Sequence, residues 1–168
     1  MPKIRTHELI LMGMLTGILF MGQVILAFLP NIEIVTLLIL LYTLIFGRKV
    51  FLIVYTFVLL EGIFYGFGLW WINYLYVWSV LVVIALIFRT QRSSLFWSIV
   101  VGFFGLFFGA LCAIPYFFIS GPAAAFSYWI AGIPYDIIHC IGNAGLCLIL
   151  FNPGYYILNK LYTRVLSE

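Results

Sequence analysis

Long apolar runs, separated by short polar, glycine-containing or proline-containing segments, dominate this sequence. A membrane-spanning helix needs about 20 mostly apolar residues, and we interpret six of the runs as spans. The expected spans are Leu9 to Leu29, Ile34 to Phe46, Val50 to Leu69, Asn73 to Phe88, Leu95 to Ile119 and Ile133 to Phe151. The expected breaks are Pro30-Asn31, Gly47 to Lys49, Trp70-Trp71, Arg89 to Ser94 and the Gly/Pro/Ala-rich loop Ser120 to Gly132, with a polar tail after Asn152-Pro153. The pattern predicts an all-α integral membrane protein with six transmembrane helices.

Composition supports the same class. Of 168 residues, 66% are hydrophobic, and the mean hydropathy is +1.24, whereas the apolar share of soluble domains is roughly 45–50%. We expect a single membrane domain over residues 1–168, with no separate catalytic domain. The first apolar run is as long as a full span and has no small-residue cleavage site before Pro30, so we expect it to be retained. The three cysteines (Cys112, Cys140 and Cys147) lie in apolar segments without a CxxC pair, and neither a metal site nor a disulfide framework is expected.

The basic residues predict the topology. A six-span path places all eight of them on one side, which the positive-inside rule makes the cytoplasm. They are Lys3, Arg5, Arg48, Lys49, Arg89, Arg92, Lys160 and Arg164. Both termini are then cytoplasmic, and the opposite, outer face carries no Lys or Arg.

An aromatic patch lies on that outer face. The stretch Phe64 to Trp78 reads FYGFGLWWINYLYVW and is uncharged. Tryptophan and tyrosine are enriched at both membrane interfaces, so an aromatic belt is one interpretation of the patch. The second span is short, and we expect the preceding LPNIEIVT to dip into the outer leaflet, where irregular backbone must be buried in protein or line a wet cavity.

Polar side chains near this patch suggest a binding site. An ionisable residue within a span costs on the order of 2.5 to 3.5 kcal/mol and by default marks a site lined with water, a partner or a ligand. An interhelical hydrogen-bond network is the alternative interpretation, and the two are compatible. The candidate ligand-binding residues are Asn31, Glu33, Glu61, Tyr65, Trp70, Trp71, Asn73, Tyr74, Trp129, Asp136, His139 and Asn143. Among them, Asp136, His139 and Asn143 share one helical face that we expect to point into the bundle.

The charges of this face constrain the ligand. Carboxylates are present but Lys and Arg are not, so a ligand recognised through its own carboxylate or phosphate is disfavoured. A neutral or cationic planar heterocycle is favoured, with cation–π support from Trp70, Trp71, Tyr74 or Trp129.

A GxxxG motif in the first span suggests a helix–helix contact. Gly13, Thr16 and Gly17 are candidates to face a partner subunit, and packing inside the bundle is the alternative. The sequence has no Walker A, HExxH, GxSxG or Gly-rich nucleotide fingerprint. We therefore expect no enzymatic activity and no cofactor, and any active transport must draw its energy from another chain.

The sequence resembles the substrate-binding S components of energy-coupling factor (ECF) transporters, the vitamin-uptake ABC systems of bacteria. The resemblance covers nearly the whole chain and rests on LPNIEIVTLLILL, SGPAAAFSYWIAG and GIPYDIIHCIGN. The family usually has alanines in its small-xxx-small motif, whereas this chain has Gly13 and Gly17.

The resemblance implies a six-helix S component in the bacterial plasma membrane that captures a vitamin or precursor from outside. Its partners would be a transmembrane T subunit and two ATPases, with no nucleic acid. In the family the outer loops and sixth helix line the pocket. The resemblance therefore implies that the pocket residues of this chain include Asn31, Trp129, Asp136, His139 and Asn143. The charge argument favours cobalamin, pyridoxine-type or thiamine-type ligands. An ATP-independent secondary carrier or channel, and a small membrane enzyme using Glu61, Asp136 and His139, remain the competing hypotheses.

Overall fold

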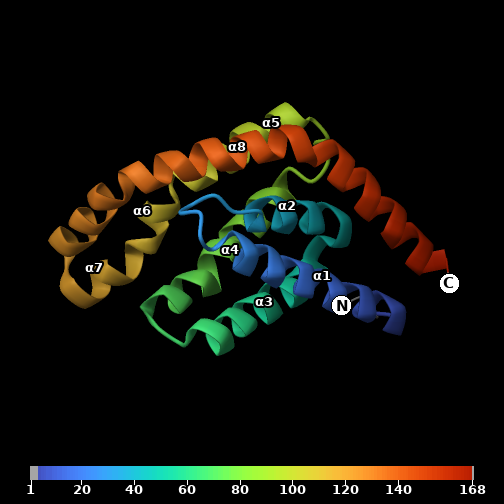
Figure 1. Ribbon diagram of the computed structural model, residues 1–168, viewed down its shortest axis with the longest axis horizontal. Coiled ribbons are helices and arrows are strands. Elements are labelled where there is room, and N and C mark those ends of the chain that lie inside the picture. The colour runs from blue at the N-terminus through green and yellow to red at the C-terminus, as the bar shows by residue number, and fades with distance from the viewer. Residues whose placement is uncertain (1–3, 168) are drawn as a thin grey trace.

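The computed structural model describes residues 4–167, which are almost entirely helical and include no strand (Figure 1). The helices are α1 (Thr6–Leu26), α2 (Val35–Phe46), α3 (Val50–Tyr65), α4 (Leu69–Ile87), α5 (Ser94–Leu106), α6 (Phe108–Cys112), α7 (Ile114–Ser120) and α8 (Pro122–Ser167), with the short 3-10 helix η1 (Gly47–Lys49) between α2 and α3. The expected all-α class is confirmed.

Several of these helices are long and apolar enough to cross a membrane. Within the described residues, four continuous helical stretches qualify: α1, residues 35–65, α4 and most of α8. A fifth forms if α5 is combined with α6 and α7 across a bend of 41°. The chain is thus compatible with a membrane protein, as the sequence indicated.

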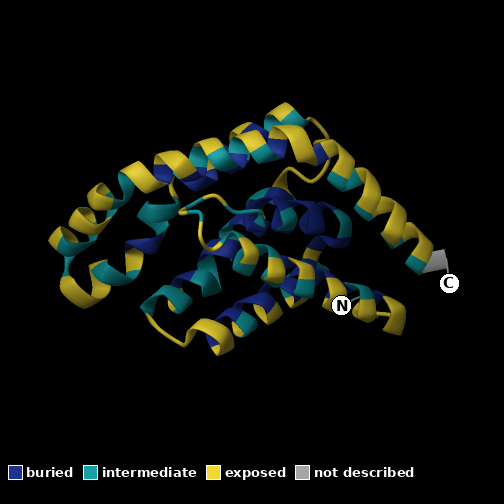
Figure 2. Ribbon diagram, in the orientation of Figure 1, coloured by how far each residue is buried: buried dark blue, intermediate teal, exposed yellow. Residues whose placement is uncertain are grey.

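Helix α2 is the centre of the bundle. Ten of its 12 residues are buried, so other elements surround it on nearly all sides (Figure 2). It ends at Gly47, whose φ of 59° lies in the left-handed region that glycine adopts without steric cost. The chain reverses there, and α2 and α3 run in opposite senses on either side of η1 (Figure 1).

Glycines allow α5 and α6 to pack closely on α8. A Cβ atom at Gly105 would lie only 2.9 Å from the backbone of His139, and one at Gly102 would lie 3.3 Å from the Cβ of Ala144. Small residues at such contacts let two helix backbones approach each other in a membrane. This contact places the polar face of α8 against the interior of the bundle.

The bend between α5 and α6–α7 is held by side chains from two other helices. The backbone N–H of Gly109, in the first turn of α6, donates to Oδ1 of Asp136 on α8 at 2.9 Å. Pro115 has no N–H for the carbonyl of Leu111, four residues earlier, and the hydroxyl of Tyr76 on α4 donates to that carbonyl at 2.6 Å. Backbone groups released by the break are therefore satisfied by α4 and α8.

Two of the expected breaks are wrong, because both stretches lie largely within helix α8. The stretch Ser120 to Gly132, expected to be a loop, is helical from Pro122 onward, and the helix also continues through Asn152-Pro153. Proline is favoured at the first helical position, and the three alanines that follow Pro122 are strong helix formers. Gly121, with a φ of 86°, makes the actual turn between α7 and α8.

The expected break at Trp70-Trp71 is also wrong. Both tryptophans belong to α4, which begins at Leu69. The turn before it contains Gly66, whose φ of 86° ends α3. Glycine adopts a positive φ without the steric cost that a Cβ atom would impose, and it therefore suits this turn.

Figure 1 places both chain termini at one end of the molecule. We call it the basic end, because the described Lys and Arg residues lie at the start of α1, in η1, in the loop between α4 and α5 and in the last part of α8. Nζ of Lys49 contacts both carboxylate oxygens of Glu8 at 2.7 Å, and the hydroxyl of Tyr162 on α8 donates to the same carboxylate at 3.1 Å. The Arg92 guanidinium lies 4.9 Å from the Tyr155 ring centroid. Lys3, part of the predicted basic set, lies outside the described residues.

The outward faces of the helices are apolar, whereas polar side chains lie inside the bundle. Along the outward face of α1, Ile10, Met14, Ile18 and Ile25 each expose more than half of their surface. By contrast, the carboxyl of Glu61 is nearly inaccessible. This distribution suits helices that contact lipid, because polar side chains in such helices turn toward the bundle interior.

Candidate functional site

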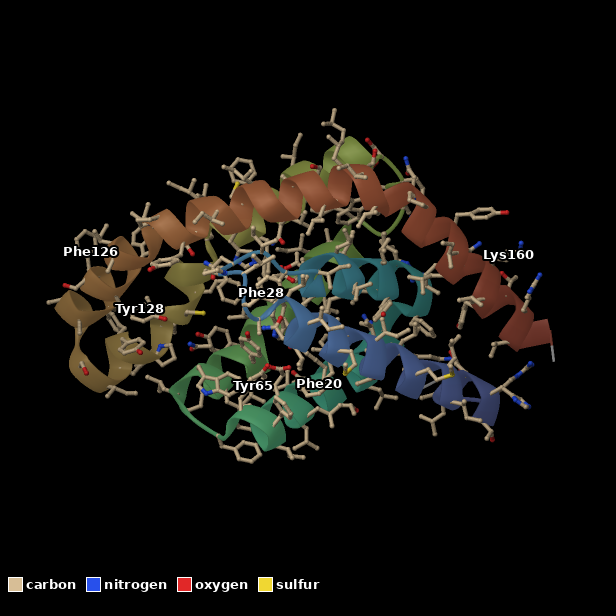
Figure 3. All side chains as sticks on the ribbon, in the orientation of Figure 1. Phe20, Phe28, Tyr65, Phe126, Tyr128 and Lys160 are labelled. Carbon is tan, nitrogen blue, oxygen red and sulfur yellow. The ribbon has the colours of Figure 1, made fainter. Side chains whose placement is uncertain are left out.

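A cavity of about 480 Å³ lies between the end of α1, the loop that follows it, and helices α3, α4, α6 and α8. Six segments of the chain thus line one space. Its lining residues are Gln23, Leu26, Ala27, Leu29, Pro30, Asn31, Ile32, Glu33, Glu61, Tyr65, Trp70, Tyr74, Trp78, Phe108 and His139. Figure 3 labels Tyr65 near this region and Lys160 at the opposite end of the molecule. No Lys or Arg is among the described residues that line the cavity.

The loop between α1 and α2 forms one wall of the cavity and is fastened to α8. Oε1 of Glu33 lies 3.0 Å from Nε2 of His139, and Oε2 of Glu33 accepts the backbone N–H of Thr36 at 2.8 Å. The Asn31 side chain donates to the carbonyl of Tyr135 at 2.9 Å. Asn31 itself has a φ of 56°, a conformation in which asparagine is several-fold enriched among non-glycine residues.

The partners of Glu33 control its ionisation. Burial of the carboxyl favours the neutral form, but the hydrogen bond and charge of His139, with the N–H of Thr36, outweigh it and lower the pKa of Glu33 below 4.5. The Glu33 carboxylate is therefore already compensated by protein groups.

Glu61 differs from Glu33 in this respect. It lies on α3, is 2% exposed and lines the cavity, and its Oε1 atom has no hydrogen-bond partner among the described residues. A buried polar group without a partner is costly, and such groups are rare in native proteins. Glu61 is therefore an acidic residue of the cavity lining whose buried Oε1 atom is not compensated by a described protein group.

Aromatic rings form the wall opposite the loop. Trp70, Tyr74 and Trp78 recur every four residues along α4, and successive ring centroids lie 5.4 Å apart in edge-to-face geometry. The series continues through Phe108 on α6, 5.7 Å from Trp78, to the ring of His139, a further 4.9 Å away. Perpendicular neighbours support one another because the edge of each ring is positive and the face is negative.

The structure places other predicted site residues outside this cavity, in helix–helix contacts. The indole N–H of Trp71 donates to the carbonyl of Val58 at 2.8 Å and joins α4 to α3. Asn73 lies 3.1 Å from the hydroxyl of Tyr76. Asp136 accepts the N–H of Gly109, as described above. The contacts of Trp71 and Asp136 join two helices and match the interhelical network that the sequence left open as an alternative, whereas Asn73 and Tyr76 both belong to α4.

Asn143 is buried beside this network on the same face of α8. It is 3% exposed, and its Nδ2 atom has no partner among the described residues. Together with Asp136 and His139, it forms the inward polar face that the helical spacing predicts. Of the three, only His139 lines the cavity.

Trp129 belongs to a second, apolar cavity of about 490 Å³ between α6–α7 and the start of α8. Its walls are alanine, isoleucine, proline and phenylalanine side chains, with Trp129 at one edge. Two neighbours of Trp129 in the chain, Phe126 and Tyr128, are labelled in Figure 3 on the same α7–α8 hairpin. The structure thus separates Trp129 from Glu61 and His139, with which the sequence analysis had grouped it.

Sequence reasoning missed Gln23, Trp78 and Phe108 as cavity-lining residues. Trp78 follows Trp70 and Tyr74 at helical spacing, but this signal was lost when the helix was expected to begin after Trp71. Gln23 is a polar side chain within the first span, and the reasoning applied to Glu61 would have found it. Phe108 carries no local signal, because its position depends on the bend after α5.

The predicted partner-facing residues of α1 divide between two faces. Gly13 is exposed and Gly17 is half-buried, and a Cβ atom added at either would meet no atom within 4 Å among the described residues. Thr16 is 3% exposed and donates its hydroxyl hydrogen bond to the carbonyl of Met12. The two glycines therefore leave an open face, whereas Thr16 points into the bundle.

This arrangement suits non-covalent binding of a small molecule. A mostly apolar and aromatic cavity with a few fixed polar groups is the general form of such sites. The comparisons with family models, with curated proteins and with solved structures give no match to this chain.

Proposed function

We propose that this chain is the substrate-binding S component of an ECF-type ABC importer in the bacterial plasma membrane. It captures a vitamin or vitamin precursor from outside the cell for ATP-driven uptake. The observation that carries the proposal is the aromatic cavity, which is lined by Glu61 with its unpartnered Oε1 atom and lies away from the basic end (Figure 3). A neutral or cationic ligand of cobalamin, pyridoxine or thiamine type is favoured, because no described lining residue is Lys or Arg.

The proposed topology has six crossings with both termini in the cytoplasm. In this topology α2 and α3 are two spans on either side of the turn at Gly47, and α5–α7 form one bent span. Helices α1, α4 and α8 are the other three. The positive-inside rule then assigns the basic end to the cytoplasm and the cavity to the outside. Labelling of single cysteines introduced at residues 67 and 160 of a cysteine-free variant tests this, and only the former is expected to react with an impermeant reagent.

The partner would be a transmembrane T subunit carried by two ATPases. The open face around Gly13 and Gly17 is the proposed contact, since small residues allow close approach of a second helix. Replacing both glycines with leucine is expected to abolish co-purification with the T subunit while ligand binding persists. Normal co-purification of this variant would refute the role of the face.

The first experiment is to purify the chain from cells grown in vitamin-rich medium, denature it and identify any released small molecule by mass spectrometry. Recovery of a vitamin-like compound supports the S-component assignment. Uptake into liposomes driven by an ion gradient, with no ATPase present, would support a secondary carrier instead. Turnover of a substrate by the purified chain would support an enzyme.

A further inference from the structure

The two carboxyl groups of the cavity are not equivalent. Glu33 is matched by the ring of His139 at 3.0 Å and by the N–H of Thr36 at 2.8 Å. Glu61 lies on another helix and has no protein partner at its buried Oε1 atom within the described part of the chain. The described cavity lining offers Glu61 no Lys or Arg, and its one histidine is already paired with Glu33, so a positive group on a bound molecule would compensate the Glu61 carboxylate.

A second unpartnered group lines the same cavity. Trp78 is 2% exposed, and its indole N–H finds no acceptor among the described residues. A buried tryptophan usually donates this hydrogen bond. Two residues of the cavity lining thus carry unmatched polar atoms, an acceptor on α3 and a donor on α4.

The rings between these two groups favour a flat, positively charged molecule. Tyr65, Trp70, Tyr74 and Trp78 lie along one side of the cavity, with adjacent centroids 5.4 to 6.5 Å apart. Aromatic faces attract cations within about 6 Å of the ring centre, and the effect grows when the cation is removed from water. The carboxyl of Glu61 and the aromatic wall thus favour the same sign of charge.

We propose that the cavity binds a small organic cation with a planar ring. Its positive group contacts Glu61, its ring lies against the aromatic residues of α4, and an acceptor atom receives the N–H of Trp78. This inference rests on the proposed function and narrows its substrate class. The volume of about 480 Å³ lies in the lower half of the range of about 300–1,000 Å³ typical of small-molecule sites, which suits a single heterocycle.

The test begins with an unbiased capture. The purified chain in nanodiscs is incubated with the small-molecule fraction of yeast extract and washed, and the retained compound is released by denaturation and identified by mass spectrometry. Its net charge at pH 7 is read from ion-exchange chromatography. We expect a compound that carries a positive charge and a planar ring.

The binding affinities of variants then test whether Glu61 and Trp78 contact the compound. For the captured compound we expect Glu61→Gln to weaken binding at least about tenfold, because hydrogen bonds to charged groups are the strong ones. Glu61→Asp keeps the charge and is expected to lose less. Trp78→Phe is expected to weaken binding several-fold, and Trp97→Phe serves as its matched control, since Trp97 is buried outside the cavity and donates to the carbonyl of Gln91.

The outcomes separate this inference from the proposed function. A retained anion or neutral compound, or equal affinity for wild type and Glu61→Gln, overturns the inference but leaves the S-component proposal in place. Failure of the wild type to retain any compound overturns both. If Glu61→Gln does not fold, the comparison rests on Glu61→Asp and Trp78→Phe, and unchanged affinity in both overturns the inference.

Discussion

Gly109 is predicted to be one of the least replaceable residues of the bundle. A methyl group at this position would lie 2.8 Å from Oδ1 of Asp136 and would collide still more closely with Oδ2. The carboxylate cannot simply turn away, because Oδ1 accepts the N–H of Gly109 at 2.9 Å. Gly109→Ala must therefore displace either the side chain of Asp136 or the helix that carries it.

The cost can be worked out from these contacts. Forcing an extra carbon into a packed interior costs typically about 1–3 kcal/mol. Losing an interhelical hydrogen bond in a membrane protein costs about 0.6 to 2 kcal/mol more. The higher helix propensity of alanine recovers up to about 1 kcal/mol. We expect Gly109→Ala to lower the free energy of unfolding by about 1–4 kcal/mol.

Equilibrium unfolding in mixed micelles, with sodium dodecyl sulfate as denaturant and tryptophan fluorescence as readout, measures this loss. Gly145→Ala is the matched control, because a Cβ atom at Gly145 on α8 would meet no described atom within 4 Å. The reasoning fails if Gly109→Ala unfolds at the same denaturant fraction as Gly145→Ala.

Three other side-chain contacts also carry predictions. Lys49→Met leaves the Glu8 carboxylate buried without its 2.7 Å partner and should cost about 3–5 kcal/mol in the same unfolding assay, and adding Glu8→Gln should recover part of that loss. Because the pKa of Glu33 is lowered in the folded state, the stabilising contribution of its carboxylate is present above about pH 4.5 and is lost as the pH falls through the lowered value. The stability difference between wild type and Glu33→Gln should therefore shrink as the pH falls below about 4.5. Trp70→Ala should weaken ligand binding, whereas Trp129→Ala should leave it within twofold in a titration, and equal losses would contradict the separation of the two cavities.

The helical class and the inward polar face of α8 could be predicted because they depend on local periodicity. Apolar runs of spanning length and the i, i+3, i+7 spacing of Asp136, His139 and Asn143 are properties of the sequence itself. Helix ends were harder to predict. The Pro-Ala-Ala-Ala stretch after Gly121 was interpreted as a loop by composition, although a proline at the first helical position is compatible with a helix.

The set of residues that line the cavity could not be predicted from the sequence. Trp71 and Trp70 are neighbours in the chain, yet one donates to the carbonyl of Val58 and the other lines the cavity. Phe108 reaches the cavity only because the helix breaks after Leu106. That bend is held by hydrogen bonds from Tyr76 and Asp136, which come from distant parts of the chain.

The length of α8 has a mechanical consequence. Its 46 residues have a contour of about 69 Å at about 1.5 Å per residue, more than twice the roughly 30 Å hydrocarbon thickness of a bilayer. Figure 1 shows that α8 is curved, and Pro134 and Pro153 lie inside it, so the helix extends past the hydrocarbon layer or follows a bent path through it. His139 joins α8 to the loop that lines the cavity, and Tyr162 joins it to Glu8 near the start of α1. One helix therefore connects the cavity wall to the end of the protein that holds both termini.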